Sequence, residues 1–60
     1  MTKHDRSPEV PGRYVIARNN SRYVIEVFMV KGVLWYRYSV NATCWTLSPT
    51  EFTEWDAIDE

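Results

Sequence analysis

Few residues of this chain could take part in covalent or metal chemistry. The 60 residues include one cysteine, Cys44, one histidine, His4, and two glycines, Gly12 and Gly32. A catalytic nucleophile needs a base beside it, a zinc site needs about four ligands, and a phosphate-binding loop needs several glycines, so none of these sites can be assembled. We therefore predict that the protein is not an enzyme and has no catalytic residue, no metal site and no cofactor.

Aromatic and arginine side chains follow one another in VLWYRYSV, residues 33–40. These residue types stack on nucleic-acid bases and also anchor protein partners. Successive side chains of a strand point to opposite faces of a sheet, so only half of this stretch can serve one surface. The strands and their registers therefore decide which side chains are candidates.

Three short breaks divide a run of β-branched and aromatic residues that begins at Gly12. They are Asn19-Asn20, Lys31-Gly32 and Asn41-Ala42. Read as two-residue hairpin loops, they predict a four-stranded antiparallel β-meander. In this register Cys44 lies on the outer face opposite Ser39. The apolar side chains then share the other, inner face: Tyr14, Ile16, Tyr23, Ile25, Val27, Met29, Leu34, Tyr36, Tyr38, Val40, Trp45 and Leu47.

The last thirteen residues, SPTEFTEWDAIDE, must help to cover this inner face. Ser48-Pro49-Thr50-Glu51 matches a capping box with proline at the first helical position, which predicts a short helical turn. Phe52, Trp55 and Ile58 could then form a buried stripe, whereas in the alternative FTEWDAI joins the sheet as a fifth short strand. The predicted class is mainly β, a small α+β fold with a four-stranded meander.

Charge and length complete the expected organisation. We expect residues 1–11, which are polar and contain two prolines, to be a flexible lead-in that leaves His4 solvated, and residues 12–60 to be one domain with an acidic C-terminal segment. Net charge is −1, with every lysine and arginine before residue 38 and five acids after Ser48. No apolar run approaches about 20 residues and the N-terminus lacks the apolar core of a signal peptide, so we expect a cytoplasmic protein without a membrane partner.

The outer face provides the candidate binding residues. The first two loops place Glu26 between Arg13 and Arg37, and Phe28 opposite Trp35. An aromatic pair bordered by arginine is typical of protein-protein contact surfaces. The candidate partner-binding residues are Phe28, Trp35, Arg37, Arg13 and Arg22, and the candidate acidic-tail contacts are Glu51, Glu54 and Asp56.

Three stretches, SPEVPGRYVIA, VFMVKGVLWY and FTEWDAI, together resemble small phage and prophage domains of unknown function. Those domains begin with a Leu-Pro-Glu and Gly-x-Tyr-Val-Leu-Val type strand and close with Val-Thr-His-Trp-Met-Pro-Leu-Pro. Here Glu54 stands in place of the histidine, and Asp56-Ala57-Ile58-Asp59 replaces the ending. The resemblance implies an origin among small viral accessory proteins and a more strand-like FTEWDAI.

These observations predict a non-enzymatic protein-protein interaction module. Its most concrete form is a phage or prophage accessory protein that binds a host protein in the bacterial cytoplasm, with inhibition of that protein as one version. The alternatives are a single-stranded nucleic-acid binder that uses Trp35, Phe28 and the flanking arginines, and a homodimer that pairs its outer faces. Net charge of −1 and the acidic tail favour a protein partner over nucleic acid.

Overall fold

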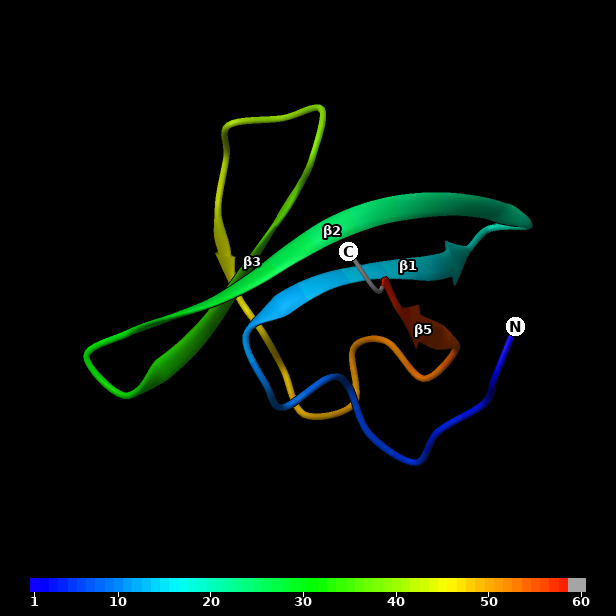
Figure 1. The fold of residues 1–60 in the computed structure, drawn as a ribbon, viewed down its shortest axis with the longest axis horizontal. Coiled ribbons are helices and arrows are strands. Elements are labelled where there is room, and N and C mark those ends of the chain that lie inside the picture. Colours follow the sequence, from blue (N-terminus) through cyan, green and yellow to red (C-terminus); the bar gives the residue numbers. More distant parts are fainter. Residues whose placement is uncertain (59–60) are drawn as a thin grey trace.

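The computed structural model describes residues 1–58, which form one antiparallel sheet (Figure 1). Its strands are β1 (Gly12–Arg18), β2 (Ser21–Val30), β3 (Val33–Tyr38), β4 (Trp45–Thr46) and β5 (Trp55–Ala57). Their spatial order is β4-β3-β2-β1-β5, so the first four strands are a meander and β5 returns to the free edge of β1. The expected mainly β meander is confirmed. Within residues 1–58 no helix has the length and apolarity needed to cross a membrane.

The first two hairpins have the predicted registers. Arg13 pairs with Glu26 across β1 and β2, and Glu26 pairs with Arg37 across β2 and β3. Both tight turns use left-handed backbone at both central residues, with φ of 52° and 63° at Asn19 and Asn20, and 52° and 79° at Lys31 and Gly32. This geometry matches the right-handed twist of the paired strands. Two local turns therefore align the three long strands.

The predicted third loop, Asn41-Ala42, is wrong. The chain leaves the sheet after Tyr38 and returns at Trp45, which pairs with Tyr36. The turn lies two residues earlier, at Ser39-Val40, because the Asn41 backbone N–H donates to the Tyr38 carbonyl at 3.0 Å. Asn41 Oδ1 accepts from the Thr43 N–H at 2.9 Å. The pairing differs from the prediction by two residues, an even number that keeps Trp45 on the inner face, where it stacks on Tyr36 with ring centroids 5.6 Å apart.

The capping-box segment makes one turn and no helix within the described residues. The Glu51 N–H donates to the Ser48 carbonyl at 3.2 Å, and the Ser48 N–H donates to Glu51 Oε1 at 3.5 Å. The chain then straightens into β5, where Trp55 pairs with Ile16 and Ala57 with Tyr14. The fifth-strand alternative is therefore correct and the helical stripe is wrong. Pairing with β5 satisfies the backbone groups along the edge of β1, which would stay without strand partners if residues 55–57 formed a helix.

Residues 2–7 of the N-terminal segment, which we expected to be a flexible lead-in, make backbone contacts with the rest of the chain. Lys3 forms an antiparallel bridge with Glu54, flanked by hydrogen bonds from Trp55 N to Thr2 O at 3.1 Å and from His4 N to Thr53 O at 2.7 Å. Ser7 and Pro8 are buried. The segment supplies partners to the outer edge of β5, whose backbone would otherwise face solvent.

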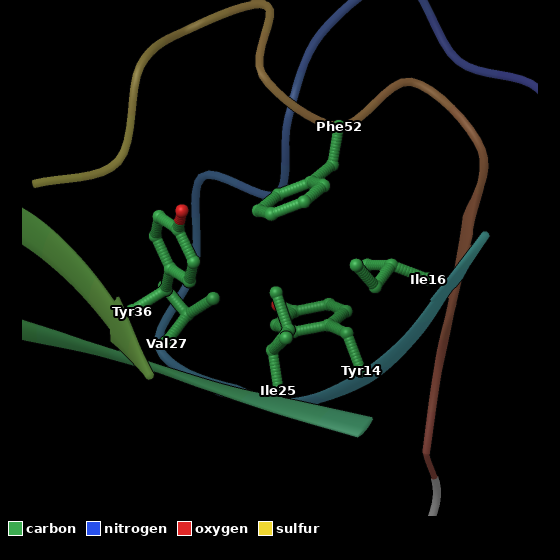
Figure 2. Close-up of a cluster of buried hydrophobic side chains, with 6 residues drawn as sticks. All are labelled: Tyr14, Ile16, Ile25, Val27, Tyr36 and Phe52. Atoms are coloured by element: carbon green, nitrogen blue, oxygen red, sulfur yellow. The ribbon is translucent and has the colours of Figure 1, made fainter. Parts of the chain in front are cut away.

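The core lies between the inner face of the sheet and residues 47–54, here called the cover (Figure 2). Tyr14, Ile16, Ile25, Val27 and Tyr36 project from the strands, and Phe52 closes the cluster from the cover. Ser7 ties the N-terminal segment to the cover, because its Oγ donates to the Ser48 carbonyl at 2.8 Å and accepts from the Phe52 N–H at 2.9 Å. Figure 1 shows the cover and the N-terminal segment on the same side of β1 and β2.

Candidate functional site

Three facing pairs follow one another along the outer face of β2 and β3. They are Val30 with Val33, Phe28 with Trp35, and Glu26 with Arg37, and we call these six residues the outer ladder. Facing residues of an antiparallel pair share one face of the sheet, and the same face recurs every second residue. The hairpin register therefore produces an apolar stripe that ends in an ion pair.

The hairpin that carries this stripe extends beyond the rest of the sheet. The last pair of β1 with β2 joins Gly12 to Val27, so β2 continues from Phe28 to Val30 with β3 as its strand partner. Figure 1 shows the β2–β3 turn projecting away from the other elements. Met29, Val30 and Val33 are 51%, 45% and 47% exposed at this tip. Adjacent exposed apolar side chains of this kind mark contact surfaces.

Arg37 borders the apolar stripe in a defined position. Its Nη2 donates to Glu26 Oε1 at 2.5 Å, and its Nη1 donates to the Asn41 carbonyl at 3.4 Å. The side chains of Arg37 and Glu26 are 34% and 37% exposed, so solvent screening limits this ion pair to about 1 kcal/mol or less. Arg13 lies opposite Glu26 on the other flank. The row of Arg13, Glu26 and Arg37 therefore helps to fix the register of the three strands but adds little to the free energy of unfolding.

The structure separates Arg22 from the other predicted partner-binding residues. Phe28, Trp35, Arg37 and Arg13 lie on or beside the outer ladder, whereas Arg22 is exposed near the start of β2, opposite Ala17. The six residue steps along the strand from Arg22 to Phe28 span about 20 Å. A partner at the tip would need a large footprint to contact Arg22.

The three predicted acidic contacts do not form one surface. Glu51 turns inward: its Oε2 accepts from the Tyr36 hydroxyl at 2.5 Å and lies 3.6 Å from Arg18 Nη2. Glu54 sits in the backbone bridge with Lys3. Asp56 pairs with Val15 across β5 and β1. Its carboxylate accepts a hydrogen bond from Thr2, and this bond is the largest of the effects that lower the pKa of Asp56. Asp59 and Glu60, also part of the predicted acidic segment, lie outside the described residues.

The inner-face contacts of two residues, Arg18 and His4, were missed from the sequence. Arg18 lies over the Phe52 ring, 4.8 Å from its centroid, and its Nη1 donates to the Tyr38 hydroxyl at 2.9 Å. Strand alternation could have placed Arg18 on the same face as Ile16, but no local pattern links it to the distant Phe52. His4 stacks on Trp55 at a ring-centroid distance of 3.6 Å, so it is not the solvated residue expected.

Cys44 is exposed in the segment between β3 and β4 and not opposite Ser39, because the third register differs from the prediction. Among residues 1–58 no three histidine, cysteine, aspartate or glutamate side chains gather in a way that could hold a metal ion. The arrangement favours contact with another molecule through the outer ladder.

Comparisons with protein-family models, with curated proteins and with solved structures find no match to this chain.

Proposed function

We propose that this protein is a non-enzymatic interaction module that binds a partner protein through the outer ladder. The observation that supports this is the projecting hairpin tip, where exposed Val30 and Val33 adjoin the Phe28–Trp35 pair on the outer face. Tryptophan and arginine are enriched among residues that dominate binding energy, and Arg37 lies at the border of this stripe.

The hairpin is well suited to binding because it is already ordered. Its strands are held in register by six residue pairs from Ile25–Tyr38 to Val30–Val33, and its turn is fixed at Lys31-Gly32. An ordered surface loses less conformational entropy on association than a loop that must first become rigid. A narrow two-stranded projection with an apolar end fits a groove on a partner.

The partner in this proposal is a protein of a bacterial host, and the site of action is the host cytoplasm. The resemblance of three stretches of the chain to small phage and prophage domains supports this choice. Inhibition of the partner would follow if the hairpin occupied a groove that the partner uses for its own ligands.

Capture from a bacterial lysate with wild type and three variants tests the proposed surface. We expect wild type and Val10→Asp to retain the same partner, and Val33→Asp and Trp35→Ala to lose at least about ten-fold in affinity once that partner is purified. Val10 is a matched control, because it is 67% exposed and lies in the N-terminal segment, away from the outer ladder.

Equal capture of the same partner by all four proteins, or no specific partner for wild type, would remove the outer ladder from the function. Trp35 is half-buried, so Trp35→Ala could also weaken the fold. Val33→Asp keeps the test decisive, because Val33 is 47% exposed and its replacement leaves no cavity. Circular dichroism of each variant verifies folding before capture.

A further inference from the structure

A cavity of about 300 Å³ opens on the inner face near the β1–β2 turn, at the end of β2 opposite the hairpin tip. It is lined by Arg18, Tyr23, Tyr38, Val40 and Asn41. Tyr23 and Tyr38 alternate along their strands with Val24 and Arg37, which face the other way. The cavity therefore lies on the face opposite the outer ladder and is independent of the proposed protein-binding surface.

Arg18 is held in place beside this cavity by three side chains. The Phe52 ring lies 4.8 Å from its guanidinium carbon, its Nη1 donates to the Tyr38 hydroxyl at 2.9 Å, and its Nη2 lies 3.6 Å from Glu51 Oε2. Arg18 lines the cavity and Glu51 does not, so the charged residue of the cavity wall is a cation. A guanidinium fixed before binding loses little entropy when it pairs with an anion.

The other polar groups of the cavity wall are arranged to donate hydrogen bonds. The Tyr38 hydroxyl accepts from Arg18, so its own hydrogen can be donated to a third group. Asn41 Oδ1 accepts from the Thr43 N–H at 2.9 Å, which leaves the side-chain NH₂ as the donor end of the amide. The wall therefore complements a negatively charged group that accepts several hydrogen bonds.

Apolar surface makes up the rest of the wall. Tyr23 and Tyr38 meet edge to face, with centroids 5.6 Å apart and an interplanar angle of 72°, and Val40 adds an aliphatic side chain. Aromatic rings pack well against a further ring in stacked or edge-to-face geometry. A volume of about 300 Å³ is at the lower end for ligand cavities, which restricts the ligand to a small molecule.

We propose that this cavity binds a small aromatic carboxylate, with its ring against Tyr23 and Tyr38 and its carboxylate toward Arg18 and Asn41. This binding site is additional to the proposed protein-binding function, and neither depends on the other.

Titration of the full chain with benzoate, followed by amide NMR shifts, tests this site. We expect saturable shifts at Arg18, Tyr23, Tyr38 and Asn41 with a dissociation constant on the order of 1 mM, as a ligand this small allows.

Benzamide keeps the ring but loses the charge, and we expect it to bind at least about ten-fold more weakly. Cyclohexanecarboxylate keeps the charge but loses the aromatic ring, and we expect weaker binding than for benzoate. Equal affinity for benzoate and benzamide, or shifts that do not saturate or that map elsewhere, would overturn the proposal.

A matched pair of variants separates the site from a general charge effect. Asn41→Asp keeps the oxygen that accepts from Thr43 but replaces the NH₂ donor with a negative charge, so we expect benzoate affinity to fall at least about ten-fold. Thr53→Asp adds the same charge at an exposed residue outside the cavity lining, and we expect less than about a two-fold change. Similar losses in both variants would contradict the assigned site.

Discussion

Tyr36 shows how one residue serves both the core and a polar contact. Its side chain is 4% exposed, and its ring meets Phe52 edge to face with centroids 5.0 Å apart. Its hydroxyl reaches the edge of the core and donates to Glu51 at 2.5 Å. A buried tyrosine needs such a partner because an unpaired hydroxyl in an apolar environment is costly. Burial first, and then the hydrogen bond to Glu51, raise the pKa of Tyr36 to about 12.

This pKa predicts a loss of stability at alkaline pH. A tyrosine in the unfolded chain has a pKa of about 10, so the folded state holds this proton more tightly. The contribution of about 2 to 3 kcal/mol to the free energy of unfolding is complete below about pH 10 and is lost as pH rises towards 12. Urea unfolding across this range measures it. In Tyr36→Phe the decline should be shallower than in wild type, and parallel curves for the two proteins would contradict the prediction.

At the scale of elements, the N-terminal segment and the cover depend on each other. Neither forms a helix or a long strand, yet together they close the inner face of the sheet. Ser7 joins them through its Oγ, which contacts Ser48 and Phe52, and the Ser7 N–H donates to the Pro49 carbonyl at 2.7 Å. Irregular segments can cover a core only if their backbone groups find such partners.

Ser7→Ala should therefore destabilise the protein. It leaves the Phe52 N–H and the Ser48 carbonyl without the hydroxyl that each contacts, at a cost of about 1 to 3 kcal/mol in the free energy of unfolding. Ser39→Ala is the matched control, because Ser39 is exposed and the same change there should cost less than about 0.5 kcal/mol. Urea unfolding of both variants measures the difference, and equal costs would show that Ser7 does not link the two segments energetically.

At the scale of the whole molecule, the charges bear on the alternative functions. Arg37 is part of the outer ladder and Lys31 lies at the hairpin turn, but Glu26 pairs with Arg37. The chain as a whole has a net charge of −1. Affinity for phosphate backbones grows with accumulated positive charge. The distribution of charge therefore favours a protein partner over single-stranded nucleic acid.

Titration of a single-stranded oligonucleotide at about 50 and 200 mM salt should accordingly show no salt-sensitive binding. Sedimentation of the protein without oligonucleotide measures its oligomeric state. We expect a monomer with a mass near 7.1 kDa, whose outer ladder is not covered by a second copy. Strongly salt-dependent binding would favour the nucleic-acid function. A mass near twice the monomer would instead favour the homodimer that pairs its outer faces.

Much of the sheet could be predicted because its information is local. Asn19-Asn20 and Lys31-Gly32 form tight turns, and alternation along the adjoining strands then places Phe28 opposite Trp35 and Glu26 opposite Arg37. A slip of one residue would expose the apolar face, and the two tight turns select one register among those that alternation allows. Leu34, Tyr36 and Tyr38 of VLWYRYSV accordingly face the core, and Trp35 and Arg37 lie on the other face. Val40, which alternation also placed inward, is 93% exposed because β3 ends at Tyr38.

The sequence by itself thus determined the three long strands, their registers and the two faces of the sheet. Only the tertiary structure decided the third loop, the path of FTEWDAI along β1, the packing of residues 2–8, and the contacts of Arg18 with Tyr38 and Glu51. The physical reason is that these features satisfy backbone edges and polar groups of segments far apart in the chain. Turn chemistry and alternation act between neighbours and do not encode such partners.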